Sequence, residues 1–184
     1  MGMDVYGLNP ILKGARPEID WSSNPSQEET DAYLIASDAW HSENQGAYFR
    51  NNVWYWKPLW EFVCELCDEV LSEEEKNKGW FNDGYEYDAD TALEIANRLH
   101  DALESGFVQK YAERRKEHLA GLPLETCNLC DGTGVRDDEY VQGKCNGCDG
   151  TGQVKQWVTN YPFEVENVQE FEQFCRLSGG FEIC

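Results

Sequence analysis

The chain lacks the features that would place it at a membrane or outside the cell. It has no apolar run near the roughly 20 residues that a membrane-spanning helix needs. Its opening residues, MGMDVYGLNP, contain neither the basic nor the apolar region of a secretory leader. Only three histidines occur, and they form no nucleophile or metal-ligand pattern. We therefore expect a cytoplasmic protein without membrane contact.

Basic residues are also scarce. The 184 residues include 15 Lys and Arg against 35 Asp and Glu, which gives a formal net charge of -20. A field of this sign repels nucleic acid and anionic membranes and attracts basic surfaces. We expect a protein partner with a basic or neutral surface and no direct contact with nucleic acid.

Hydrophobic periodicity favours an α+β protein that is predominantly helical. Five segments have a helical pattern: about 28–40, 58–71, 91–103, 108–119 and 167–175. We expect Ser26 to cap the first helix, Pro58 to lie in the first turn of the second, and Thr91 to cap the third. Extended chain is expected near 3–8 and over 153–162, and the last residues, FEIC, would add a short edge strand.

One eight-residue pattern occurs twice, as CNLCDGTG at residues 127–134 and as CNGCDGTG at residues 145–152. Two residues between cysteines let both thiolates face one ion, and two such pairs are typical of a structural zinc site. The expected zinc ligands are Cys127, Cys130, Cys145 and Cys148. Four thiolates leave no open position for water, so one Zn²⁺ here would hold shape and would not activate a nucleophile. A pair of disulfides is the alternative.

Each pair of cysteines is followed by two glycines at a fixed distance, and these complete the predicted site. They permit positive φ, so that backbone amides fold beneath the sulfurs and donate hydrogen bonds to them. The glycines concerned are Gly132, Gly134, Gly150 and Gly152. Between the two motifs, VRDDEYVQGK can form a hairpin. We therefore predict a single small domain, an acidic and mainly helical core from residues 1–126 and 153–184, with a zinc-binding β-hairpin element inserted at 127–152.

The repeated motif resembles the CxxCxGxG element of the DnaJ-type zinc-binding region. In that family four repeats bind two zinc ions, and the region helps to hold non-native polypeptides or supports dithiol chemistry. The resemblance covers residues 127–152 only, with two repeats, and implies a small, rigid protein-binding or scaffold element. The His-Pro-Asp of a J-domain does not occur, so stimulation of a chaperone ATPase is not implied. The remainder, including NNVWYWKPLW and SGGFEIC, resembles small uncharacterised proteins of bacteria and their phages.

The other four cysteines raise the question of a second metal site. Cys64 and Cys67 have the same spacing, and Cys175 and Cys184 lie far along the chain as possible further ligands. No glycine pattern follows Cys64 and Cys67, and both fall in an expected amphipathic helix. Buried thiols are the favoured interpretation, and a second zinc or a redox pair stays open.

Acidic residues concentrate between positions 61 and 94, where twelve acids and two lysines give half of the net charge. Steps of four residues along a helix place carboxylates about 6 Å apart, which is comparable with the spacing of phosphates. A possible partner-binding acidic face comprises Glu61, Glu65, Asp68, Glu73, Glu74 and Glu75. A solvated helix face is the plainer interpretation.

These patterns favour a non-catalytic, zinc-stabilised protein-protein interaction module that acts as an adaptor, a chaperone-like binder or a regulator. Two other classes stay open. The first is an acidic inhibitor that imitates nucleic acid, encoded by a phage and directed at a nucleic-acid-binding or defence enzyme. The second is a thiol-redox or metal-dependent enzyme. The sequence does not define the oligomeric state.

Overall fold

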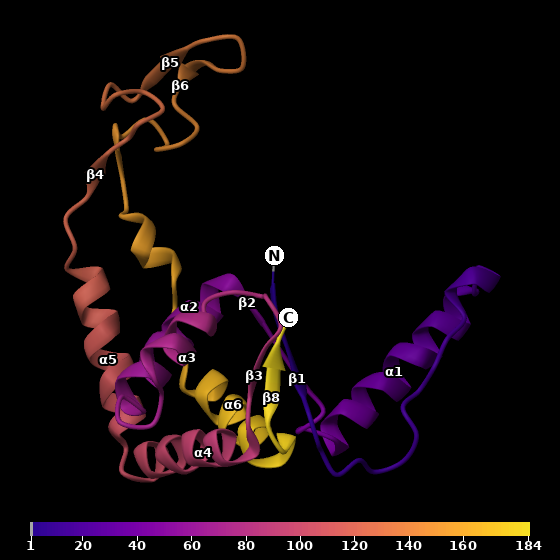
Figure 1. Ribbon diagram of the computed structural model, residues 1–184. Helices are drawn as coiled ribbons and strands as arrows, with labels where there is room; N and C mark the ends of the chain where they lie inside the picture. Colours follow the sequence, from indigo (N-terminus) through magenta and orange to yellow (C-terminus); the bar gives the residue numbers. More distant parts are fainter. Residues whose placement is uncertain (1) are drawn as a thin grey trace. The chain divides into compact units, whose positions relative to one another are not determined.

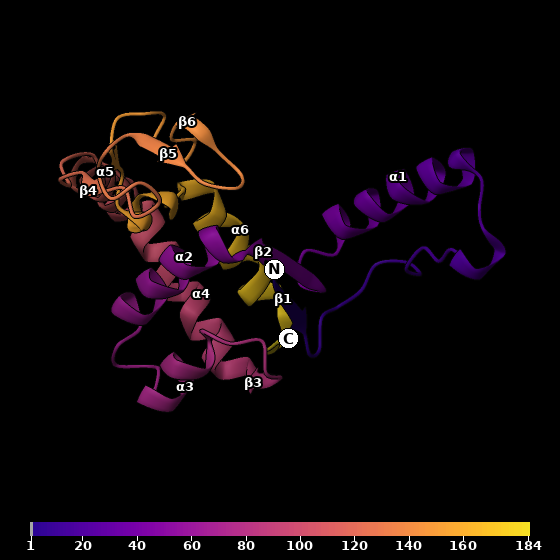
Figure 2. The ribbon, with the colours of Figure 1, turned by 90° about the horizontal axis from the view of Figure 1, so that it is seen from above.

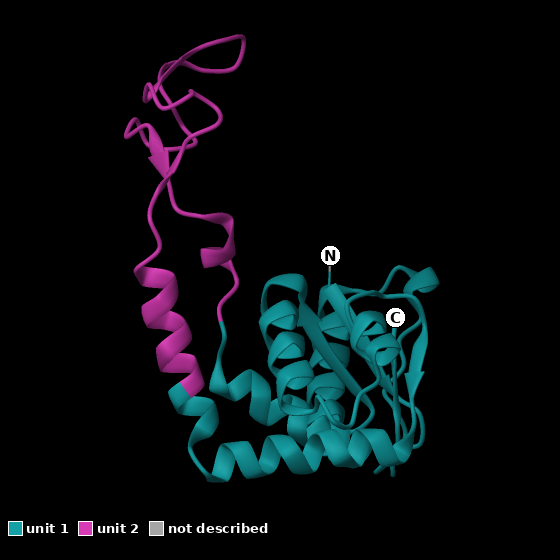
Figure 3. Cartoon of the chain, turned by 60° about the vertical axis from the view of Figure 1, so that its left-hand side comes forward, with its two compact units in different colours: residues 1–110, 163–184 teal, residues 111–162 magenta. Residues whose placement is uncertain are grey.

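The computed structural model describes residues 2–184, and the chain divides into two compact units (Figure 3). Unit 1 is Met1–Lys110 with Phe163–Cys184, and unit 2 is Tyr111–Pro162. The predicted element at 127–152 lies inside unit 2, which extends beyond it on both sides. Helices predominate and the sheets are small, which confirms the predicted α+β class. None of the helices in the described residues is long and apolar enough to cross a bilayer.

Unit 1 is built around an antiparallel sheet of four strands in the order β2-β1-β8-β3 (Figure 1). The strands are β1 (Gly2–Gly7), β2 (Tyr48–Asn52), β3 (Tyr85–Tyr87) and β8 (Phe181–Ile183). The prediction of an edge strand at the C-terminus was wrong, because β8 pairs with β1 on one side and β3 on the other. Its alternating pattern buries Phe181 and Ile183 completely, as an interior strand requires.

Helices α2 (Val53–Leu66) and α6 (Val165–Ser178) pack on strands β1 and β2, and α4 (Ala89–Glu104) packs on these two helices (Figures 1 and 2). Unit 1 also contains α1 (Gln27–Glu43), α3 (Glu73–Lys78) and the short 3-10 helix η1 (Trp21–Ser23). Helix α5 (Phe107–Ala120) begins in unit 1 and continues into unit 2. All five expected helices are therefore present with different ends, and α3 is an additional helix that the sequence patterns did not predict.

The helix caps show where sequence patterns were ambiguous. Ser26 caps α1 through a capping box with Glu29, as expected. Helix α4 begins earlier than predicted, because the Asp88 carboxylate accepts the Thr91 amide at 2.7 Å and takes the capping role assigned to Thr91. At the other end of the unit, Gly179 closes α6 in the left-handed conformation, with φ 62°.

Helix α2 begins five residues before the predicted Pro58. The Asn52 side chain accepts the amides of Trp54 and Tyr55 at 3.0 and 3.2 Å, so it starts the helix there. Pro58 consequently lies inside the helix and is buried, and its lack of an N–H removes one intrahelical backbone hydrogen bond. The helix ends at Leu66 and not near residue 71.

Aromatic side chains fill the core of unit 1. Trp56 and Trp60, one turn apart on α2, stack with ring centroids 5.5 Å apart and are at most 1% exposed. Their indole N–H groups donate to the carbonyls of Gly79 (2.8 Å) and Lys76 (2.9 Å), so neither is buried without a partner. A Cβ at Gly79 would lie 2.0 Å from the Trp60 ring, which fixes glycine there.

Unit 2 has two short antiparallel pairs. β4 (Glu125–Thr126) pairs with β7 (Gln153–Val154), and β5 (Val135–Asp137) pairs with β6 (Gln142–Lys144) as the predicted hairpin. The expected strand over 153–162 was wrong beyond its first two residues. Its partner β4 offers only two residues, and the chain then turns into the 3-10 helix η2 (Trp157–Asn160), where the Thr159 amide and hydroxyl both donate to the Gln156 carbonyl.

Candidate metal centre

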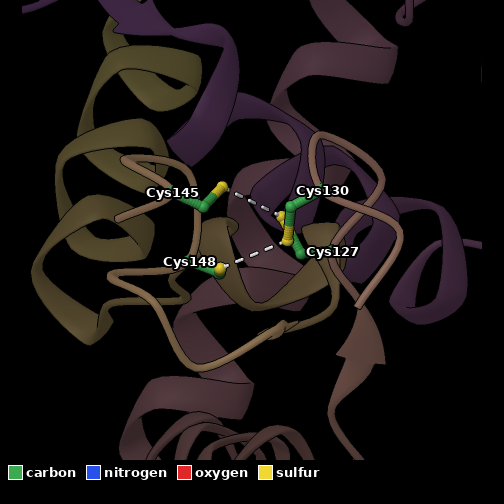
Figure 4. A group of neighbouring side chains, drawn as sticks. All are labelled: Cys127, Cys130, Cys145 and Cys148. Atoms are coloured by element: carbon green, nitrogen blue, oxygen red, sulfur yellow. Dashed lines mark hydrogen bonds between the residues drawn. The ribbon is translucent and has the colours of Figure 1, made fainter. Parts of the chain in front are cut away.

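The four cysteines of the repeated motif converge in unit 2 (Figure 4). Each lies directly after a short strand or within the turn that follows it, and each is buried, with at most 7% exposure. Their sulfur atoms all lie within 4.8 Å of one another. The Sγ atoms of Cys127 and Cys145 are 3.9 Å apart, and those of Cys130 and Cys148 are 3.7 Å apart.

These distances decide between metal and disulfide. Four sulfurs at about 2.3 Å from a tetrahedral zinc are about 3.8 Å from one another, whereas sulfurs in a disulfide are about 2.05 Å apart. The four cysteines are free thiols at the larger separation. Cys127, Cys130, Cys145 and Cys148 therefore form a closed donor set that fits one structural zinc ion and leaves no side for a water ligand.

Backbone amides support two of the sulfurs, as the glycine pattern predicted. The Gly134 amide donates to Cys130 Sγ at 3.3 Å, and the Gly152 amide donates to Cys148 Sγ at 3.2 Å. All four predicted glycines have positive φ; Gly132, Gly134, Gly150 and Gly152 lie between 75° and 81°. These bonds favour the thiolate form that a metal needs.

The first knuckle (residues 127–134) and the second knuckle (residues 145–152) hold each other in a nearly symmetric way. The Cys127 amide donates to the Gly152 carbonyl, and the Cys145 amide donates to the Gly134 carbonyl, each at 2.9 Å. A Cβ at Gly152 would lie 2.2 Å from the Gly132 carbonyl oxygen, and one at Gly134 would lie 2.4 Å from that of Gly150. Glycine is therefore required here by the close approach of two backbones as well as by φ.

Sequence reasoning missed two supporting residues in each knuckle. The hydroxyls of Thr133 and Thr151 donate to the carbonyls of Cys130 and Cys148, each at 2.7 Å. The aspartates before the first glycine, Asp131 and Asp149, adopt positive φ of 47° and 53°, which aspartate tolerates better than most residues. The sequence does contain a signal for these aspartates and threonines, because both motifs repeat the whole of DGTG and not only its glycines.

The crowded sulfurs alter one another's acidity. Burial raises the pKa of the Cys148 thiol, but the Gly152 amide and the other three thiols outweigh it and hold that pKa at about 7. The Leu129 amide lowers the pKa of Cys127, but burial and the neighbouring thiols outweigh it and raise that pKa to about 11. Four adjacent thiols do not all ionise readily, and full ionisation of the set calls for the positive charge of a cation.

The other four cysteines form no comparable cluster. Within residues 2–184, no second group of three or more potential ligands comes together. Cys67 and Cys175 are buried, Cys64 is half-buried and Cys184 is exposed. Burial raises the pKa of Cys64 and of Cys67 to about 12, so both are protonated at neutral pH, which agrees with buried thiols and disfavours a nucleophilic role.

The six acidic residues singled out in the sequence lie on two helices and the turn between them. Glu61 and Glu65 are on α2, Asp68 lies beyond its end, and Glu73, Glu74 and Glu75 form the first turn of α3. Asp68 and Glu73 both bind the Lys76 ammonium, at 2.6 and 2.7 Å. The Glu75 carboxylate caps α3 by accepting the Ser72 amide at 2.7 Å. Part of this acidic cluster is thus engaged within unit 1.

No family model, curated protein or solved structure matched the chain. The zinc-binding element is therefore defined by its geometry. The resemblance to the DnaJ-type region rests on the two CxxCxGxG motifs alone, and the resemblance of the remainder to bacterial and phage proteins gains no support from the comparisons.

Proposed function

We propose that this protein is a non-catalytic interaction module in which one zinc ion holds unit 2 in a fixed shape for binding another protein. The observation that carries the proposal is the closed set of four buried thiols. Such a set supplies rigidity and no open coordination position for chemistry. The DnaJ-type motif adds the expectation of a small protein-binding or scaffold element.

The surface of the zinc element supports a contact role. Leu129 lies in the first knuckle, and Val135 and Tyr140 lie in the hairpin between the knuckles. These apolar side chains are exposed by 52%, 57% and 83% respectively. The hairpin is anchored at its base by both knuckles, so Val135 and Tyr140 should lose less conformational freedom on binding than they would in a free loop.

The test compares hairpin variants in the full chain. Immobilised wild-type protein, the double variant Val135→Ser with Tyr140→Ser, and the control Glu139→Ser would be exposed to extract from the source cell. Retained proteins would be quantified by mass spectrometry. We expect a partner set retained by wild type and control, and lost by the double variant, while all three keep one zinc per chain. Equal retention by the double variant contradicts the contact role of the hairpin.

A second function, that of an acidic inhibitor, is favoured by the uneven charge. Unit 1 contains 27 acidic and nine basic residues, a formal charge of -18, whereas unit 2 contains eight and six, a charge of -2. Such a field suits the basic groove of a nucleic-acid enzyme. The triple variant Glu61→Lys, Glu65→Lys and Asp68→Lys would then abolish salt-sensitive binding to a panel of purified nucleases and polymerases. Binding that survives this change removes the inhibitor hypothesis.

A further inference from the structure

Unit 1 contains a groove that the zinc element does not explain. Its volume is about 450 Å³. Tyr48, Phe49 and Arg50, three consecutive residues of strand β2, line it. Side chains of neighbouring strand residues point to opposite faces of a sheet. A groove that all three residues line therefore runs along the edge of the strand.

The two walls of the groove come from opposite faces of the sheet. On one face, Phe49 packs on Phe171 of α6, with ring centroids 5.2 Å apart, and α6 contributes Gln169, Glu170 and Gln173 to the wall. On the other face, the Tyr48 ring lies 5.9 Å from that of His41, which lines the groove together with Gln45. The groove thus spans both faces at the outer side of β2, the terminal strand in the order β2-β1-β8-β3.

Hydrogen bonds show which main-chain groups of β2 face the groove. The amides of Asp4 and Cys184 donate to each other's carbonyls at 3.2 and 2.8 Å, so Asp4 bonds towards β8. Bonding direction alternates along a strand, so Val5 bonds towards its β2 partner Phe49. The Gly7 amide, which donates to the Ala47 carbonyl at 3.1 Å, fits this alternation.

The same alternation turns the N–H and C=O of Tyr48 and Arg50 away from β1 and into the groove. In the part of the chain that the structure describes, no hydrogen bond from another residue reaches these four groups. An edge of this kind is a template for one more strand. Helix α6 runs beside it: Asn167 at its start accepts from the Asn51 side chain at 2.7 Å, and Leu177 near its end packs on Gly46 before β2.

We propose that this groove binds an extended, lysine-containing segment of a partner protein, which adds to β2 as a fifth strand. The main-chain groups of Tyr48 and Arg50 would pair with the segment, and the amide side chains of Gln169 and Gln173 flank it. The charge of -18 on unit 1 and the Glu170 carboxylate on the wall favour a basic segment. The Asp4 carboxylate holds Arg50 at 3.6 Å on one face, which offsets its positive charge.

This inference goes beyond the proposed role of the zinc element, because every residue of the groove belongs to unit 1. The two proposals can fail separately. Loss of zinc removes the proposed hairpin contact and leaves the groove, whereas a change in β2 leaves the four thiols in place.

The test uses the full chain and a fluorescent heptapeptide of alternating lysine and valine as the probe. The variant Arg50→Pro removes the N–H that faces the groove, at an edge position where proline is tolerated. Its matched control, Arg50→Ala, removes the same side chain and keeps the N–H. A second variant, Glu170→Lys, reverses the wall charge without touching the sheet. Circular dichroism and zinc content confirm that each variant is folded.

Fluorescence anisotropy should show binding by wild type, an affinity loss of about tenfold or more for Arg50→Pro, and no loss for Arg50→Ala. Glu170→Lys should also weaken binding. Amide exchange at Tyr48 and Arg50 should slow when the peptide binds. The same peptide methylated at every backbone amide should not bind, because it has no N–H left to pair with β2.

Three results would overturn the proposal. The first is that the heptapeptide binds neither wild type nor Arg50→Ala. The second is that the methylated peptide binds as well as the unmethylated one, so that charge alone explains the affinity. The third is that the protein dimerises, with protected Tyr48 and Arg50 amides, in the absence of peptide. The last result assigns the edge to a second copy of the chain.

Discussion

The two units of this protein are stabilised by different kinds of interior. Unit 1 buries a continuous set of large apolar side chains, among them Trp56, Trp60, Phe171 and Phe181. In unit 2 the described residues offer no buried apolar side chain other than those of the four cysteines, with Val154 partly buried beside them. The first unit has a hydrophobic core, and the second has a cluster of sulfurs in the place of one.

This difference teaches which part of the chain depends on metal. Burial of apolar area contributes about 25 cal/mol per Å² and needs no ligand, so unit 1 can fold on its own core. Four thiols in contact give little of this stabilisation and resist full ionisation. We therefore expect unit 2 to rely on a cation, and the two units to respond oppositely to changes in metal and changes in packing.

Removal of the metal should have the largest effect. Structural zinc contributes roughly 10–16 kcal/mol to the folding of small zinc domains. We expect a strong chelator, or the double variant Cys127→Ser with Cys145→Ser, to unfold residues 127–152. Unit 1 should keep its fold. Amide exchange read by mass spectrometry would show fast exchange in 127–152 and unchanged protection in α4 and α6.

The control for this experiment is Cys64→Ser, which changes a thiol outside the cluster and should leave one zinc per chain. Exchange that increases throughout unit 1 after chelation contradicts the comparison. It would show that the hydrophobic core also depends on the metal.

Truncation of the core is the reverse experiment. Trp60→Ala removes a fully buried ring that stacks on Trp56 and donates to the Lys76 carbonyl. We expect a loss of about 3–5 kcal/mol in the free energy of unfolding. The measurement is chemical denaturation followed by far-ultraviolet circular dichroism. Zinc stoichiometry of the folded variant should stay at one, and release of zinc at the same denaturant concentration as wild type would support independent units.

A single methyl group should test how tightly the knuckles approach each other. At Gly152, φ is 77° and a Cβ would lie 2.2 Å from the Gly132 carbonyl oxygen. Gly152→Ala should weaken zinc binding by about 10–100-fold, since the amide of this residue supports Cys148 Sγ. Competition with a chromogenic chelator measures the change.

The matched control is Gly143→Ala in the hairpin. Gly143 also has positive φ, at 111°, but its Cβ would meet nothing within 4 Å. Gly143→Ala therefore adds backbone strain but no steric clash, and it should bind zinc more tightly than Gly152→Ala. Equal losses would mean that φ, and not the contact between knuckles, explains the glycine.

The candidate site could be predicted from the sequence because its information is local. Two residues separate the ligands within each knuckle, and the glycines that turn the chain follow within four residues. The repeat predicts the same pair of ligands and glycines twice. Only the pairing of the two knuckles is non-local, and one shared ion requires it.

Features that depend on distant partners were harder to predict. Phe181–Ile183 reads as a short terminal strand, and its interior position follows only from β1 and β3 on either side. The groove joins residues 41–50 to 169–173, and neither segment has a motif of its own. At Asp88 and Thr91 the difficulty was different, since both residue types cap helices and only the hydrogen bond distinguishes them.

The smallest predicted effect concerns the cap of helix α4 by Asp88. It tests whether a change confined to unit 1 leaves the zinc site of unit 2 unaffected. Asp88→Ala should lower the free energy of unfolding by about 1 kcal/mol, because the amide of Thr91 loses its acceptor. Thr91→Ala, which keeps the Asp88 carboxylate, should cost less. Both variants should bind zinc as wild type does. A larger loss of unfolding free energy for Thr91→Ala than for Asp88→Ala would show that Thr91 is the capping residue, as the sequence predicted.

The cap should also depend on pH in a definite direction. Hydrogen bonds from the backbone and hydroxyl of Thr91 lower the pKa of the Asp88 carboxyl below its usual value. A carboxyl with a lowered pKa in the folded state stabilises the protein above its unfolded pKa, and this contribution disappears as the pH falls through the folded value. Wild type should therefore lose its advantage over Asp88→Ala in acid. Denaturation of both proteins at neutral and at acidic pH measures this, and a difference that stays constant would show that the carboxylate charge does not contribute to the cap.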